Sequence, residues 1–78
     1  NLQCNEGTTA ILWCEVSQTN LKAKWYKDGD EILDSNRHRL YSRDKTHRLE
    51  IRNVVIADKG TYCVLIRKIK KTCQLDIK

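Results

Sequence analysis

Apolar and polar residues alternate along most of this 78-residue chain, in short stretches separated by turn-forming residues. The first long stretch runs from Thr8 to Val16, and its alternate apolar set is Ala10, Leu12, Cys14 and Val16. Side chains on a strand point alternately to opposite faces, so this set predicts a strand with one face in a core. Turn signals such as Asp28-Gly29 and Asp44-Lys45 divide the rest of the chain in the same way. The pattern therefore predicts an all-β chain of short strands.

Further strands are predicted on both sides of this stretch. Leu2-Gln3-Cys4 forms a short first strand, and helical periodicity is limited to a single turn near Val55 to Asp58. His38 alternates with Leu40 and Ser42 on a middle strand. The residues predicted to face the core elsewhere are Ala23, Trp25, Leu49, Ile51, Val54, Tyr62, Val64, Ile66, Cys73, Leu75 and Ile77, with Leu21 left open.

The stretch from Asp58 to Val64 predicts a sharp corner in the chain. Gly60 has no Cβ, so the backbone can turn tightly there. Tyr62 can then place its ring in a core and its hydroxyl on backbone upstream, an arrangement called a tyrosine corner that occurs in β-sandwiches. Asp58 is predicted to be a corner or salt-bridge residue, with an arginine on the strand from Arg37 to Arg43 as its partner.

Several stretches of the chain carry a resemblance to a known family. They are Glu6-Gly7 with 10–17, then 23–32, 49–62 and 72–77. On these residues the chain resembles an immunoglobulin domain of the intermediate set (I-set), and it is most similar to the tandem modules of giant muscle proteins such as titin, obscurin and myosin-binding protein C. The resemblance implies a two-sheet Greek-key immunoglobulin sandwich. Its structural core residues would be Cys14, Trp25, Leu49, Ile51, Asp58, Gly60, Tyr62 and Val64.

The resemblance also implies how the chain is organised and used. Residues 1–78 are expected to be a single domain excised from a larger multidomain chain, with its N-terminal edge strand truncated, because such sandwiches usually have about 100 residues. The expected function is that of a load-bearing structural and protein-binding module in a tandem array, in the cytoplasm at the sarcomere or myofibril. Expected partners are neighbouring immunoglobulin or fibronectin-type domains and sarcomeric or cytoskeletal proteins. Two alternatives stay open, an extracellular adhesion or receptor immunoglobulin domain and a regulatory immunoglobulin module of a muscle kinase.

The four cysteines bear on the cellular compartment. Many immunoglobulin domains link the Cys14 strand to a cysteine two residues after the corner tyrosine, and Val64 occupies that position here. Cys63 comes one residue earlier and should face away from the core, so its pairing with Cys14 would need a one-residue register shift. Reduced thiols are therefore expected, as in a reducing cytosol. Cys4 and Cys73 are both predicted to face inward on paired strands, which leaves open whether they can form a disulfide.

Charge and composition argue against several functions. The net charge of +5 permits an acidic partner, but the charges are scattered and no nucleic-acid-binding motif is present, so no nucleic-acid partner is expected. No apolar run is long enough to span a bilayer, and no membrane partner is expected. His38 lies on a strand and His47 beside the Asp44-Lys45 turn, and neither has metal-ligand spacing. Without a nucleophile elbow or a phosphate-binding glycine loop, the chain is expected to have no enzymatic activity, cofactor or metal.

Three surface features are candidates for partner binding or modification. Trp13 should lie on the outer face of its sheet, where it either covers the stem of Arg48 or Arg52 in a cation–π contact or forms a docking point. Cys63 is either an oxidisable thiol or a surface residue covered by a neighbouring side chain. The densest positive segment is predicted at the tip of the last hairpin and would be either solvated or in contact with an acidic partner. Its basic residues are Arg67, Lys68, Lys70 and Lys71.

Overall fold

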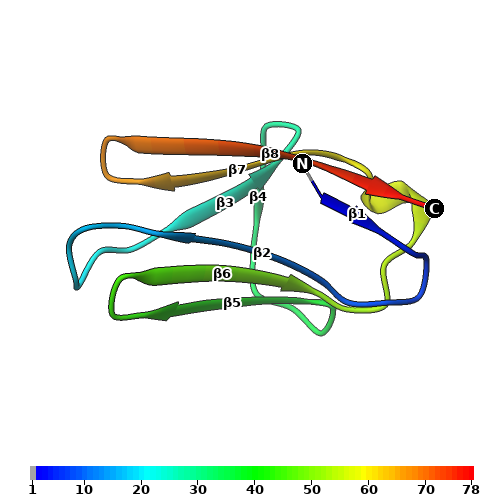
Figure 1. Ribbon diagram of the computed structural model, residues 1–78, viewed down its shortest axis with the longest axis horizontal. Helices are drawn as coiled ribbons and strands as arrows, with labels where there is room; N and C mark the ends of the chain where they lie inside the picture. Colours follow the sequence, from blue (N-terminus) through cyan, green and yellow to red (C-terminus); the bar gives the residue numbers. More distant parts are fainter. Residues whose placement is uncertain (1) are drawn as a thin grey trace.

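The regular structure of the chain consists of strands and one short turn of 3-10 helix (Figure 1). The computed structural model describes residues 2–78. Its elements are β1 (Leu2–Cys4), β2 (Ala10–Glu15), β3 (Lys24–Lys27), β4 (Asp30–Ile32), β5 (His38–Arg43), β6 (Thr46–Ile51), η1 (Ile56–Asp58), β7 (Gly60–Ile66) and β8 (Ile69–Ile77). The prediction of an all-β fold is confirmed, and η1 lies where the sequence indicates a single helical turn.

The strands form two sheets packed as layers, as Figure 1 shows. One sheet has three strands in the order β2-β6-β5, and the other has five in the order β1-β8-β7-β3-β4. The chain passes from one sheet to the other between β1 and β2, between β2 and β3, between β4 and β5, and between β6 and β7. β1 pairs with β8 in parallel, whereas the other paired strands are antiparallel. This is the predicted two-sheet sandwich with Greek-key connections.

The core lies between the sheets and is filled by alternate residues of the strands. Trp25 from the larger sheet is 4% exposed, and Leu49 and Ile51 from the smaller one are 0% exposed. Cys73 and Ala23, both predicted to face inward, are only partly buried and pack against this core, as does Leu40. The buried hydrophobic residues are Ala10, Leu12, Cys14, Val16, Trp25, Leu49, Ile51, Val54, Tyr62, Val64, Ile66, Leu75 and Ile77.

The register between β1 and β8 answers the question about Cys4 and Cys73. Cys4 lies opposite Ile77, four residues along β8 from Cys73. Four residues of strand span about 13 Å, whereas a disulfide needs Cα atoms within about 7 Å. A bridge between these two residues is therefore incompatible with the fold, and all four cysteines are free thiols.

Cys63 lies on the outer face of the five-stranded sheet, opposite Thr72 on β8. Its side chain is half-buried rather than exposed. It lines a shallow groove together with Tyr26 and Leu65. This placement favours the interpretation that neighbouring side chains cover the thiol.

Candidate functional site

The tyrosine corner has the geometry that the sequence indicates. The Tyr62 hydroxyl donates to the backbone oxygen of Asp58 at 2.7 Å, and only 1% of Tyr62 is exposed. Gly60 is required here, because its φ is +155° and a Cβ would lie 2.6 Å from Oδ2 of Asp28. Oδ1 of Asp28 accepts a hydrogen bond from the backbone N–H of Thr61 at 3.0 Å. The corner thereby fastens the start of β7 to the turn between β3 and β4.

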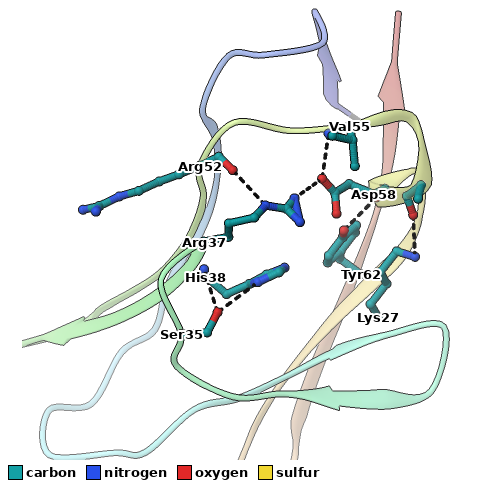
Figure 2. Close-up of polar contacts among 9 residues, drawn as sticks. Lys27, Ser35, Arg37, His38, Arg52, Val55, Asp58 and Tyr62 are labelled. Carbon is teal, nitrogen blue, oxygen red and sulfur yellow. Dashed lines mark hydrogen bonds and ion pairs between the residues drawn. The ribbon is translucent and has the colours of Figure 1, made fainter.

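The carboxylate of Asp58 joins segments that are distant in sequence (Figure 2). Its Oδ2 accepts hydrogen bonds from the backbone N–H of Val55, at 2.9 Å, and from Nη2 of Arg37. The same guanidinium donates through Nε to the backbone oxygen of Arg52 at 3.3 Å. Arg37 immediately precedes β5, so it is the arginine of that strand region that pairs with Asp58. The ion pair links the smaller sheet to η1 and, through Tyr62, to the larger sheet.

Burial and neighbouring charge set the protonation of this network. Burial raises the pKa of Tyr62, and the negative charge of Asp58 raises it further, which favours the neutral hydroxyl that donates to Asp58. Burial lowers the pKa of His38, and the positive charge of Arg37 lowers it further. Ser35 Oγ lies 3.3 Å from Nδ1 of that histidine, as Figure 2 shows. Arg37, Asp58 and Tyr62 thus form one hydrogen-bonded network at the corner, and Ser35 and His38 form a separate contact.

His47 lies near the Asp44-Lys45 turn, as predicted, on the first part of β6. Its side chain is also buried in the core, at 0% exposed, which the sequence pattern was not used to predict. Its Nδ1 lies 2.8 Å from Ser42 Oγ, and its buried Nε2 has no hydrogen-bond partner. His47, Leu49 and Ile51 are alternate residues of one strand, and this alternation was the signal that could have predicted the burial of His47. Within residues 2–78, no group of three or more His, Cys, Asp or Glu residues could hold a metal ion.

Trp13 lies on the outer face of the three-stranded sheet and is 65% exposed. Its cross-strand neighbour is Arg48 on β6, whose other neighbour is Tyr41 on β5. The Arg48 guanidinium lies over the Tyr41 ring, 4.4 Å from its centroid. The expected cation–π contact of the arginine therefore forms with Tyr41 rather than with Trp13, since the adjacent strand offers a second ring. The indole is left largely open to solvent.

The last hairpin has the predicted tip but does not gather its basic residues on one surface. Arg67 and Lys68 form a two-residue turn between Ile66 and Ile69, with Arg67 at a φ of +54°. Lys70 lies opposite the outward-facing Leu65, whereas Lys71 lies opposite the buried Val64. Cross-strand partners share a face, so these two lysines point to opposite sides of the sheet.

Lys71 lies on the side of β8 that faces the gap between the two sheets. Burial raises the pKa of the Cys14 thiol, and the positive charge of Lys71 opposes that rise. Lys71 also lines an opening at the edge of the sandwich together with Cys14 and Trp13. The segment therefore presents Arg67 and Lys68 at one end of the molecule, Lys70 on one face and Lys71 toward the gap between the sheets.

No helix among the described residues 2–78 is long and apolar enough to cross a membrane.

Comparisons with known proteins agree with that architecture. The family model of the immunoglobulin I-set domain matches residues 1–78. The chain is 35% identical over 72 residues to cardiac-type myosin-binding protein C of Gallus gallus, covering 92% of this chain and 6% of that protein. It is 36% identical over 74 residues to titin of Drosophila melanogaster, covering 94% of this chain and a share of that protein that rounds to 0%.

A solved structure gives the same result at the level of the fold. The crystal structure of a tandem of titin domains superposes with a TM-score of 0.96 at 27% identity, covering 99% of this chain and 29% of that chain. The chain thus corresponds to one domain-sized part of much longer relatives. From its profile match, its relatives and its sandwich, the chain belongs to the immunoglobulin I-set family.

Proposed function

We propose that this chain is a structural, non-enzymatic module of a cytoplasmic muscle protein, which bears load and binds other proteins in a tandem array. The relatives named titin and myosin-binding protein C support the muscle setting. The solved titin tandem supports neighbours at the ends of the domain. The register that separates Cys4 from Cys73, together with Val64 at the usual cysteine position, supports a compartment in which thiols stay reduced.

One observation carries the load-bearing role, namely the parallel pairing of the first and last strands. Leu2 lies opposite Leu75, and both strands run in the same direction. Force applied to the two ends of the chain would pull β1 and β8 in opposite directions along their length. All the hydrogen bonds between them would then share the load instead of opening one by one.

The bonds that would share this load continue past the end of β1. The Lys78 N–H donates to the Cys4 oxygen at 2.9 Å, and the Glu6 N–H donates to the Lys78 oxygen at 2.8 Å. Asp76 adds side-chain contacts, because its carboxylate meets Gln3 at 3.4 Å and Lys59 at 3.3 Å. The hydrogen bonds from Lys59 and Gln3 lower the pKa of Asp76 and thus favour its ionised form.

Force spectroscopy of the chain placed between marker domains tests this role. Glu6→Pro removes the N–H that donates to Lys78, since proline has none. Glu6→Ala changes the same exposed side chain and keeps the N–H, so it is the matched control. The proline variant should unfold at a lower peak force than the alanine variant, which should match the wild type. Equal peak forces in the two folded variants would show that the load does not pass through this ladder.

The basic hairpin belongs to the same proposal as a contact site at one end of the module. Arg67 and Lys68 lie beside the segment of Val16, Gln18 and Leu21 in a shared hollow. A positive tip at an end of the sandwich can meet an acidic partner or set the angle to a neighbouring domain.

A further inference from the structure

The outer face of the three-stranded sheet carries an exposed row of residues that the corner and the core do not use. Trp13, Arg48 and Tyr41 lie side by side in register across β2, β6 and β5. We call these three residues the aromatic–arginine row. Trp13 is 65% exposed, Tyr41 is 36% exposed, and Ile11 beside them is 45% exposed. The row is thus an open surface of large side chains on a face of the sandwich.

Arg48 is held in place within this row and lacks an acidic partner. Its guanidinium stacks on Tyr41 at 4.4 Å, and its buried Nε has no hydrogen-bond partner. No ion pair within residues 2–78 involves Arg48. A stacked guanidinium has lost much of its freedom before binding, and its planar fork matches a carboxylate.

The charges around the row leave a local positive excess. Arg52 is paired with Glu50 at 3.0 Å, and Arg39 is paired with Asp34 at 3.8 Å. Arg43, like Arg48, has no ion pair among the described residues.

A hollow adjoins these two unpaired arginines. The cationic residues Arg43, Lys45 and Arg48 line it, together with the carboxylates of Glu15 and Asp44 and the ring of Tyr41. Three cationic groups against two carboxylates leave a net positive charge, which favours a negatively charged ligand. The aromatic surface next to them favours an apolar group. A protein segment that carries both kinds of side chain fits this combination.

We propose that this face docks an acidic segment of a partner protein, in which a carboxylate pairs with Arg48 and Arg43 and an apolar side chain covers Trp13. Trp13 and Tyr41 are two strand spacings apart, about 10 Å, and about three extended residues span that distance. Buried Trp, Tyr and Arg residues dominate the binding energy of many protein interfaces. The surface lies on a face of the sandwich, so it goes beyond the proposed load-bearing role and is compatible with neighbours at both ends.

Binding of a defined probe by the whole 78-residue chain tests the proposal. The probe is a short synthetic peptide rich in Glu with two Leu residues, and its control has Gln in place of every Glu. Titrations at low salt give the affinities, and amide chemical shifts map the contact. The Glu peptide should shift resonances of β2, β5 and β6 and should bind at least tenfold more tightly than the Gln peptide.

Four variants separate this face from general attraction to a basic protein. Arg48→Gln should weaken binding about tenfold, whereas Arg48→Lys should recover only part of the loss because lysine lacks the planar fork. Arg39→Gln removes the same charge from the same face at a residue already paired with Asp34, so it should change the affinity less than twofold. Trp13→Ala should weaken binding of the Leu-containing probe without lowering the melting temperature, since the indole is exposed.

Several results would contradict the proposed docking surface. Equal effects of Arg48→Gln and Arg39→Gln, equal affinities for the two peptides, or no binding of the Glu peptide would overturn the proposal. Loss of binding in a Lys68→Glu, Lys70→Glu double variant, with Arg48→Gln unaffected, would move the site to the hairpin. None of these results would touch the load-bearing role, which the peak forces of the Glu6 variants test separately.

Discussion

Replacement of Tyr62 by phenylalanine should destabilise the domain by removing one hydrogen bond while keeping the ring. The Tyr62 hydroxyl donates to the Asp58 backbone oxygen at 2.7 Å, and the residue is 1% exposed. A buried acceptor that loses its partner costs about 1–3 kcal/mol. For a domain of this size, each kcal/mol corresponds to about 4–8 °C in melting temperature. We therefore expect a fall of at least about 4 °C.

Urea unfolding monitored by circular dichroism measures this loss. Tyr26→Phe is the matched control, because Tyr26 lies half-buried on the outer face and no hydrogen bond of its hydroxyl is present within residues 2–78. The control should stay within about 0.5 kcal/mol of the wild type. The slope of the free energy of unfolding against urea should be unchanged in both variants, since neither changes the surface exposed on unfolding. Equal midpoints for the two variants would refute the role of the corner hydroxyl.

The pH dependence gives an independent check of the same group. Burial raises the pKa of Tyr62 above its ordinary value in the folded state. A raised pKa means that the neutral hydroxyl contributes its stability below the unfolded pKa of about 10. That contribution is lost as the pH rises from there toward the folded pKa, by up to about 1.4 kcal/mol per pH unit. The stability difference between wild type and Tyr62→Phe should therefore shrink above about pH 10.

Two further predictions concern the core and the thiols. Trp25→Ala should cost about 3–5 kcal/mol, because it opens a cavity where a residue only 4% exposed packs between the sheets; a denaturant midpoint near that of the wild type would contradict the assigned packing. Thermal melts with and without a strong reductant should agree within error, since Cys4 lies opposite Ile77 and all four thiols are free; a large drop on reduction would mean that a structural disulfide exists.

The sequence by itself determined the local structure and the composition of the core. Alternation of apolar residues places Ala10, Leu12 and Cys14 on one face of a strand, whatever that strand pairs with. Asp28-Gly29 specifies its hairpin turn because both residues tolerate positive φ, and both adopt it, at +49° and +91°. Such signals arise from neighbouring residues, so they can be recognised without the fold.

The tertiary structure decided which strands face each other and in what register. The offset between β1 and β8 carries Cys4 past Cys73, and no local pattern encodes that offset. Because β6 pairs with both β5 and β2, Arg48 has an aromatic neighbour on each side. Its guanidinium stacks on Tyr41 and not on Trp13.

The same long-range geometry decided which polar side chains are buried or form ion pairs within the fold. Arg37 reaches Asp58 because the folded sheets bring the start of β5 next to η1, although 21 residues separate the two in sequence. His47 lies in the core because the period of its strand continues from Leu49 toward the turn, where the two sheets still cover it. Periodicity fixes the face of a strand on which a residue lies, whereas the contacts of that face depend on segments far away in the chain.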